Sequence, residues 1–383
     1  MSSQIYLDNA ATTPIRQEVA DAMQPYLRDL FGNPSSIHRT GQLARQAIEQ
    51  ARKTVADYLH AVPADIVFTA GGTEADFLAL TGVLRGNGKR HIVTTQIEHH
   101  AVLHTTEMLE ELGYEVTYVP PLQSGVVEVT AILDALRSDT GLVSVMWVNN
   151  ETGAIQPVLE LATELATRNI PFHVDAVQAL GILPIDVKEI PVSLLSFSGH
   201  KIYGSKGTGA LYIRKGTPYR SMLRGGAQER NRRAGTENVA GIVGFAKAVE
   251  LLAQERDLRT NLVSQLRVQF LSMLTSQLTG IELNSPNGGV PHVLNIHFQG
   301  ISAQTLLMRL DLAGIAASGG SACTAGSADL SHVLLAMGLS EGRVRSSLRF
   351  SFSSMNTEQE IAIAAAKTAE IVLDLRERAD LFH

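Results

Sequence analysis

The sequence of 383 residues contains a single cysteine, Cys323. One cysteine cannot form an intramolecular disulfide, and no group of cysteines and histidines has the spacing of a zinc site. We therefore expect a reducing compartment and no resident metal ion. The sequence also lacks an excess of positive charge, because 32 Lys and Arg oppose 38 Asp and Glu and leave a net charge of −6. Without a block of basic residues, neither nucleic acid nor its phosphate backbone is an expected direct partner.

Targeting and membrane segments are also missing from the sequence. The first residues have neither the basic stretch nor the apolar core of a signal peptide, and no apolar run approaches the roughly 18 residues of a membrane span. Hydrophobic residues make up 45% and charged residues 18% of the chain, a globular composition that excludes wholesale disorder. At about 150 residues per domain, the length indicates two domains. We expect a cytoplasmic protein, most simply an enzyme.

Between about residues 65 and 215, short β-branched runs alternate with segments of helical periodicity. The runs are 66–69, 91–95, 142–148, 172–175, 194–197 and 210–213, and the helical segments include 75–84, 101–112 and 159–167. Continuous apolar strands that alternate with helices indicate a mostly parallel sheet covered on both faces. Ligands of such sheets bind outside the carboxyl ends of the strands. The residues that follow each run are therefore the candidates for a functional site.

The remainder of the chain has a different pattern. Residues 239–278 favour one long helix or two joined ones, and a strand (293–298), a helix (303–312), a loop rich in Gly, Ser and Ala (317–328) and a strand (347–352) follow. A last helix is expected over 357–378, where Thr357 and Glu360 have the spacing of a capping box. These elements predict a second, smaller α+β domain.

The first strand of the alternating region runs into Gly71-Gly72-Thr73 and then a helix. Glycines let the backbone approach a ligand, the start of a helix offers free N–H groups to an anion, and Thr73 adds a hydroxyl. A phosphate site is one interpretation, and a tight turn capped by Thr73 is the other. The pattern matches neither a dinucleotide-binding loop nor a P-loop.

Three further strand ends carry polar side chains. His99 could stack on a flat ring or move protons, or it could be a surface histidine. Asn149 and Asn150 could bind a ligand without charge, or form an Asn-rich turn. Asp175 follows a buried strand, where a carboxylate needs a cationic partner. A protonated ring nitrogen would be such a partner, and a structural ion pair is the alternative.

Ser198-Gly199-His200-Lys201 is the most informative stretch, because it places a lysine directly after a buried strand. A desolvated amine with a lowered pKa is what Schiff-base chemistry requires. The serine and the histidine could bind a phosphate. A basic loop without covalent chemistry is the alternative, and Lys206 is the competing lysine. A phosphate cradle, a stacking histidine, an acidic partner for a ring nitrogen and an amine for an aldehyde together match the requirements of pyridoxal 5′-phosphate (PLP).

From end to end the chain resembles the cysteine desulfurases of the NifS/IscS type, which are PLP enzymes of the class V aminotransferase group. The matching motifs are YLDNAATTP (6–14), GNPSS (32–36), GGTE (71–74), EH (98–99), VNNE (148–151), VDA with Gln178 (174–178), SGHK (198–201), QERNRRAGTEN (228–238), SACT (321–324) and SLRF (347–350). The resemblance implies the type I fold of PLP-dependent transferases: a large α/β domain over 15–255 with a mostly parallel, seven-stranded type of sheet, and a small α+β domain formed by 1–14 and 256–383.

The resemblance also implies roles for individual residues. Lys201 would hold PLP and move protons, and Asp175 would pair with the pyridine nitrogen. His99 would stack on the ring and serve as an acid–base group, and Arg349, helped by Asn150, would bind the substrate carboxylate. The other implied cofactor contacts are Gln178 and Asn150 at the ring hydroxyl, Gly72, Thr73, Ser198 and His200 at the phosphate, and Thr236 at the phosphate of the neighbouring subunit of a homodimer.

Cys323 lies in a loop, 317–329, that has few bulky apolar residues to bury it. A buried structural thiol is the alternative to a functional one, but a glycine-rich loop suits a nucleophile that moves between a site and a partner. The resemblance implies that L-cysteine is converted to L-alanine while Cys323 becomes a persulfide. An iron–sulfur scaffold or a tRNA-thiolation protein would then accept the sulfur, and Cys323 could be a transient iron–sulfur ligand shared with a scaffold.

Two other functions stay open at this point. The first is another PLP reaction, such as that of a selenocysteine lyase, another C–S lyase or an aminotransferase, none of which needs Cys323. The second is a sulfur-relay subunit of low turnover.

Overall fold

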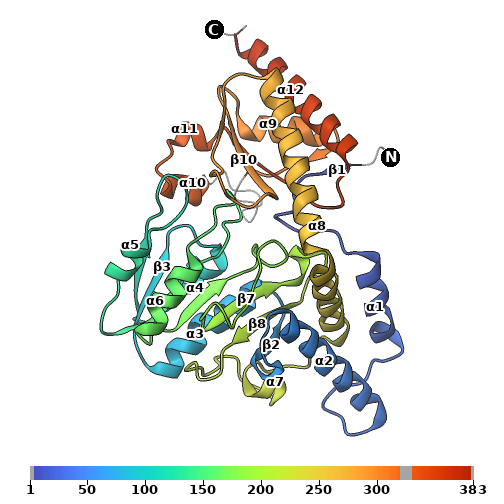
Figure 1. Cartoon of the computed structure of the whole chain (residues 1–383), viewed down its shortest axis with the longest axis vertical. Helices are drawn as coiled ribbons and strands as arrows, with labels where there is room; N and C mark the ends of the chain where they lie inside the picture. The colour runs from blue at the N-terminus through green and yellow to red at the C-terminus, as the bar shows by residue number, and fades with distance from the viewer. Residues whose placement is uncertain (1–3, 320–329, 381–383) are drawn as a thin grey trace.

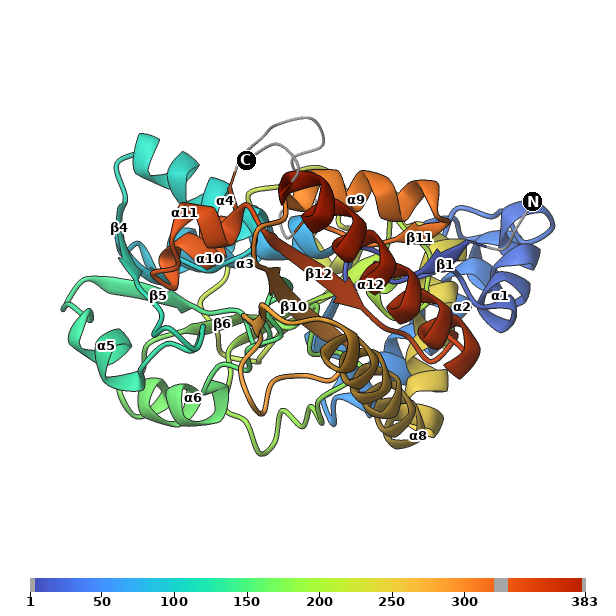
Figure 2. The same cartoon turned by 90° about the horizontal axis from the view of Figure 1, so that it is seen from above.

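The structure is a computed structural model that describes residues 4–319 and 330–380. Figure 1 shows a large sheet with its helices below and a smaller group of strands and helices above, with the long helix α8 running through both. Figure 2 shows α12, α9 and β12 of the smaller part in front of the larger one. The N-terminal segment lies beside α12, in the smaller part (Figure 1).

The larger part is built on a seven-stranded sheet of order β2-β8-β7-β6-β5-β3-β4. Its strands are β2 (Ile66–Thr69), β3 (His91–Thr95), β4 (Glu115–Val119), β5 (Thr140–Ser144), β6 (Phe172–Asp175), β7 (Leu194–Ser198) and β8 (Gly209–Ile213). Only β8 runs antiparallel to its neighbours in this sheet. The carboxyl ends of the other six strands therefore meet at one edge. The predicted fold class, an α/β protein with a mostly parallel sheet, is confirmed.

Both faces of this sheet are buried, because neighbouring residues of one strand belong to different cores. Leu211 and Ile213 pack with the apolar side of α3 (Gly72–Asn87) and with α4 (His100–Glu111). Ala210 and Tyr212 point to the opposite core. That core is covered by helices α2 (Arg39–Tyr58), α6 (Val158–Thr167) and the first half of α8 (Val239–Gln277). Burial on both faces explains the continuous apolar runs in the sequence.

The smaller part has its own core around an antiparallel sheet of order β12-β10-β9. The strands are β9 (Ile281–Leu283), β10 (Val293–Phe298) and β12 (Ser347–Ser351), and a parallel pair is formed by β1 (Ile5–Tyr6) and β11 (Ile315–Ala316). Helices α9 (Ala303–Leu312) and α12 (Glu358–Asp380) cover it. The capping box at the start of α12 is present, since Thr357 N donates to Glu360 Oε2 and Glu360 N donates to Thr357 Oγ1.

The remaining helices are short, apart from α1 (Gln17–Arg28), which packs on α8. They are η1 (Pro63–Asp65), α5 (Val129–Asp134), η2 (Gly199–Lys201), α7 (Gln228–Asn231), α10 (His332–Ala336) and α11 (Glu341–Val344). No helix of the described residues is both long and apolar enough to cross a membrane.

Helix α8 joins the two cores. Its N-terminus is capped by Asn238, whose side chain accepts a hydrogen bond from Gly241 N at 3.1 Å. Leu252 still packs in the core of the large sheet, whereas Val263 and the residues after it belong to the core of the smaller part. The predicted domain boundary at 255/256 falls between these two contacts, inside an unbroken helix, and stays a prediction.

One expected strand is shorter than its sequence pattern. The apolar run 142–148 indicates strand throughout, but β5 ends at Ser144. Beyond it, Val145 N and Trp147 N still donate to the carbonyls of His173 and Asp175. The chain then folds back, with Val148 bridged to Ile155, because the turn of Asn149 requires the backbone to leave the sheet.

Replacement of Phe270 tests the core of the smaller part. This fully buried ring on α8 contacts Phe350 and Phe352, at centroid distances of 4.8 and 5.5 Å. We expect Phe270→Ala to lower the free energy of unfolding by about 3–5 kcal/mol, because it leaves a cavity among aromatic rings. Val268→Ala on the same helix, where the side chain is 63% exposed, is the control and should change little in urea denaturation. A loss for Phe270→Ala no larger than that of the control would contradict this description of the core.

Candidate active site

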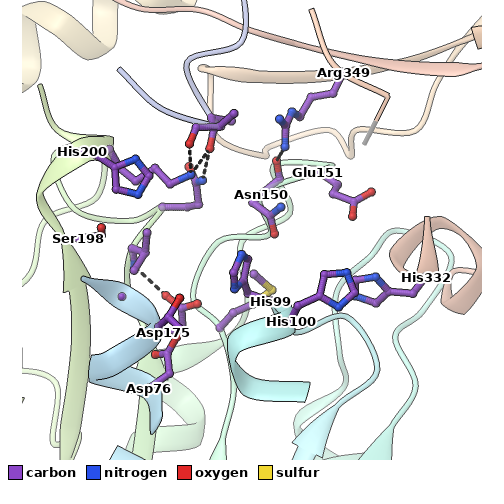
Figure 3. A pocket seen from close by; sticks show the side chains of 18 residues that line it. Asp76, His99, His100, Asn150, Glu151, Asp175, Ser198, His200, His332 and Arg349 are labelled. Carbon is purple, nitrogen blue, oxygen red and sulfur yellow. Dashed lines mark hydrogen bonds between the residues drawn. The ribbon is translucent and has the colours of Figure 1, made fainter. Parts of the chain in front are cut away.

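A cavity of about 310 Å³ lies at the edge where the carboxyl ends of the six strands meet (Figure 3). Segments that follow β2, β3, β5, β6 and β7 line it, together with Arg349 from β12 and the N-terminal segment. The lining residues are Ala10, Ala11, Gly72, Thr73, Asp76, His99, His100, Met146, Asn150, Glu151, Asp175, Val177, Gln178, Ser198, His200, Lys201, His332 and Arg349.

One end of the cavity is formed by the start of α3. Gly71 has φ +155 and ψ −173, a conformation that only glycine adopts readily. A Cβ on Gly72 would lie 2.9 Å from Val177 Cγ2, so the backbone passes too close to its neighbour for any side chain. The N-cap residue Gly71 has no side chain to cap this helix, and the first N–H groups are therefore available to an anion. Ser198 and His200 line the same cavity.

Lys201 is held by the N-terminal segment. Its Nζ donates hydrogen bonds to the carbonyl oxygens of Ala10 at 2.5 Å and Ala11 at 2.7 Å. The turn η2, which begins directly after β7, brings the lysine to this position. The amine is therefore oriented at the cavity wall before any ligand binds.

Buried carboxyl groups lie at the base of the cavity. Burial and the neighbouring Asp76 raise the pKa of Asp175 to about 7, although its Oδ1 accepts a hydrogen bond from Val177 N at 2.9 Å. Burial likewise raises the pKa of Asp76 to about 7, and that of Glu98 to about 8. Among the described residues, none of these carboxyl groups forms an ion pair with a lysine or an arginine, so the site favours a positively charged ligand group beside them.

His99 is the N-cap of α4, and its Nδ1 accepts a hydrogen bond from Ala101 N at 3.0 Å. A neutral ring with this acceptor carries its proton on Nε2. Burial and the nearby Lys201 lower the pKa of His99 to about 4, so the ring is neutral at physiological pH. Burial and Lys201 also lower the pKa of His200 to about 4.

The cavity wall opposite the sheet carries Arg349, whose side chain is buried. Its Nη2 lies 2.8 Å from Asp8 Oδ1, and its Nη1 donates to the carbonyl oxygen of Asn150 at 2.9 Å. Its Nε is buried and has no hydrogen-bond partner among the described residues. A guanidinium with an unsatisfied donor at a cavity is suited to bind a carboxylate.

The structure brings most of the predicted site residues into this one cavity. Those that line it are Gly72, Thr73, His99, Asn150, Asp175, Gln178, Ser198, His200, Lys201 and Arg349. Thr236 does not line it and is exposed. Cys323 lies outside the described residues. The individual roles of all these residues stay predictions.

Sequence reasoning did not single out several residues of the site. The carbonyls of Ala10 and Ala11 leave no signal in the side-chain pattern. Asp76 had one, because it is an acidic residue within the apolar run Ala75 to Leu80. His332 had none, and it reaches the cavity wall by a hydrogen bond between its Nε2 and the carbonyl oxygen of Glu98 at 2.9 Å. Among the described residues, no group of His, Cys, Asp and Glu side chains is arranged to hold a metal ion.

Comparison with known proteins identifies the family. The model of the class V aminotransferases matches residues 5–363. A cysteine desulfurase IscS from Methanosarcina thermophila is 46% identical over 98% of this chain and 94% of its own. A solved NifS-like protein has a TM-score of 0.90 and 37% identity, over 96% of this chain and 99% of that one. A solved structure of SspA in complex with cysteine has a TM-score of 0.83 and 36% identity, over 92% and 100%.

The fold and the strand-end cavity define an α/β protein of the class V aminotransferase type, and the chain belongs to that family. Within the family it belongs to the NifS/IscS type, whose curated relatives are named cysteine desulfurases. The resemblance inferred from the motifs is therefore confirmed.

The neutral state of His99 predicts how stability depends on pH. The unfolded chain protonates this histidine below about pH 6.5, whereas the folded protein does so only near pH 4. The wild type therefore loses stability as the pH falls from 6.5 to 4. His99→Asn keeps an N-cap acceptor but takes no proton. Its free energy of unfolding, relative to wild type, should rise on acidification by up to about 3 kcal/mol.

Urea denaturation of the ligand-free protein at several pH values provides the measurement. The matched control is His104→Asn, since His104 is an exposed residue on the same helix. If the difference between His99→Asn and wild type is the same at pH 4.5 and pH 7, the neutral ring is not the state of the folded protein.

Proposed function

We propose that the site performs PLP-dependent cysteine desulfuration, which converts L-cysteine to L-alanine and leaves a persulfide on Cys323. The chain is an enzyme of the cysteine desulfurase class by its family and its curated relatives. One observation carries the assignment of roles: Lys201, Asp175, His99 and Arg349 line a single cavity, although they come from four separate segments of the chain.

The residues of the cavity fit PLP. Asp175 is a buried carboxyl group that forms no ion pair among the described residues, and a protonated ring nitrogen would supply one. The side-chain-free start of α3, with Gly71 and Gly72, leaves room and donors for a phosphate. Thr73, Ser198 and His200 would contribute to the phosphate site, and Gln178 and Asn150 would contact the ring hydroxyl. His99 would stack on the ring.

PLP, when bound, supplies an electron sink for the substrate α-carbon. Lys201 Nζ would hold the cofactor and move the proton of that carbon. Arg349 would bind the substrate carboxylate, using the Nε that has no partner among the described residues, with Asn150 assisting. His99, neutral and with its proton on Nε2, would donate or accept one proton in these steps.

The transfer of the substrate sulfur would be the role of Cys323. Its thiolate would attack the substrate sulfur, so that an S–S bond forms as the C–S bond breaks. The electron pair left on the β-carbon takes up a proton, and the product is alanine. The two described flanks of the loop support this role. Ser318 forms a backbone bridge with Arg349, and Ser331 Oγ donates to Glu151 Oε2 at 2.5 Å beside the cavity.

A homodimer and a sulfur acceptor are the proposed partners besides L-cysteine. Thr236 is exposed and away from the cavity of its own chain, as expected for a residue that reaches the phosphate of a second subunit. Leu27, Phe31 and Ile37 are 68%, 75% and 90% exposed, and a subunit interface would cover such side chains. The acceptor would be an iron–sulfur scaffold or a tRNA-thiolation protein, and the compartment the cytoplasm.

The role of Cys323 is tested by paired assays of alanine and sulfide. Wild type, given L-cysteine and a thiol reductant, should release the two products one to one. Cys323→Ala should lose at least about 100-fold in both, because the sulfur has no nucleophile to receive it. Cys323→Ser is the conservative partner and should lose as much. Turnover that survives in both variants would instead indicate a lyase or an aminotransferase.

The role of Arg349 is tested by Arg349→Lys. A lysine cannot form the paired hydrogen bonds of a guanidinium, so we expect kcat/KM for L-cysteine to fall about 100-fold. The PLP absorbance of the purified protein should stay, because Arg349 is assigned to the substrate and not to the cofactor. Loss of the bound chromophore would show that the assignment is wrong, and Arg345→Lys, an exposed neighbour, is the control.

A further inference from the structure

A group of buried polar residues lies beneath the cavity, between the large sheet and α3. Its members are Asp76 on α3, His173 on β6, and the two serines that flank His173 on the neighbouring strands, Ser144 and Ser196. Asp76 is 1% exposed and the other three are fully buried. Sequence patterns and the proposed mechanism leave all four without a function. Polar side chains at an otherwise apolar interface between helix and sheet are costly unless they are hydrogen-bonded, and Asp76 Oδ1 has no such partner among the described residues.

The contacts within this group converge on His173. His173 Nδ1 lies 2.9 Å from Ser144 Oγ, and His173 Nε2 lies 2.9 Å from Ser196 Oγ. The same Nε2 is 3.5 Å from Asp76 Oδ1. That oxygen has no hydrogen-bond partner among the described residues. Asp76 lines the cavity, and Figure 3 shows its side chain directly below that of Asp175.

The charges around Asp76 and Asp175 allow only one of these two carboxyl groups to be ionised. Asp175, on β6, and Glu98, after β3, are the acidic groups that interact with it. A hydrogen bond with Ser196 lowers the pKa of Asp76 against the effect of burial. Lys201, after β7, and His173 lower the pKa of Asp175, and burial lowers the pKa of His173 itself to about 4, so that its ring is neutral. A PLP ring nitrogen would add one positive charge at Asp175. Two adjacent buried carboxylates cannot both be compensated by it.

We propose that Asp76 is a protonated carboxylic acid and, with His173, a positioning residue for Asp175. The neutral acid keeps the negative charge of the pair on Asp175, where the cofactor nitrogen binds, and it supports that carboxylate from below. His173 is held by its contacts with Ser144 and Ser196 on the two neighbouring strands, and it packs against the side of the Asp76 carboxyl group. Because it names a role for a residue behind the cofactor site, this inference rests on the proposed function.

The protonation state is tested on the protein without PLP by Asp76→Asn. Asn has the shape of the neutral acid and cannot ionise. The folded wild type retains the Asp76 proton that the unfolded chain has already released near pH 4, so its stability falls as the pH rises from 4 toward 7 and beyond. Asp76→Asn should remove the part of this pH dependence that comes from one proton. The free energy of unfolding of the variant should therefore increase relative to that of wild type as the pH rises.

The positioning role is tested by titrating the ligand-free protein with PLP and following cofactor absorbance. Asp76→Ala should weaken PLP binding by about tenfold or more, because Asp175 loses its support. Asp76→Asn should restore binding to within about threefold of wild type, because the neutral amide reproduces the neutral acid. Thr81→Ala, another buried polar residue of α3, is the matched control and should bind PLP as wild type does.

The outcomes separate this inference from the proposed function. If wild type fails to bind PLP, the proposed function is wrong. If wild type binds PLP, two results would overturn the role of Asp76: binding by Asp76→Asn as weak as that of Asp76→Ala, which requires a charged Asp76, or binding by Asp76→Ala equal to wild type. An unchanged pH dependence of unfolding in Asp76→Asn would also overturn it, and this measurement stands even if Asp76→Ala does not fold.

Discussion

The hydrogen bonds of Lys201 Nζ to the carbonyls of Ala10 and Ala11 are the contact on which the site depends. They join the turn after β7 to the N-terminal segment, which is tied to the smaller part in turn: Asp8 pairs with Arg349, and Ser351 Oγ accepts a hydrogen bond from Ala10 N. The segment therefore couples the residue assigned to the cofactor with the one assigned to the substrate carboxylate. A shift of this segment would move both, which explains how two separate cores can build one cavity.

Charge balance is the second constraint on the site. Asp76 and Asp175 line the cavity and interact with the buried Glu98, and burial raises the pKa of all three carboxyl groups. In the proposed function, a protonated cofactor nitrogen would compensate one of them. The others must remain neutral or accept hydrogen bonds, as Glu98 does from Thr95 Oγ1 and Met146 N. The buried carboxyl groups destabilise the ligand-free protein, and for the same reason they would favour a cationic ring over a neutral one.

The sequence predicts which residues at the strand ends form the site, because the topology of a parallel sheet brings the carboxyl ends of its strands to one edge. Lys201 and Asp175 were found in this way, from strands whose apolar runs are unambiguous. The contacts of Ala10 and Ala11 could not be found, since they use backbone oxygens and join segments about 190 residues apart. Asp76 could have been found from its apolar neighbours, but only the structure places it below Asp175. The exposed Thr236 lies outside the cavity of its own chain, and its predicted role depends on the proposed homodimer.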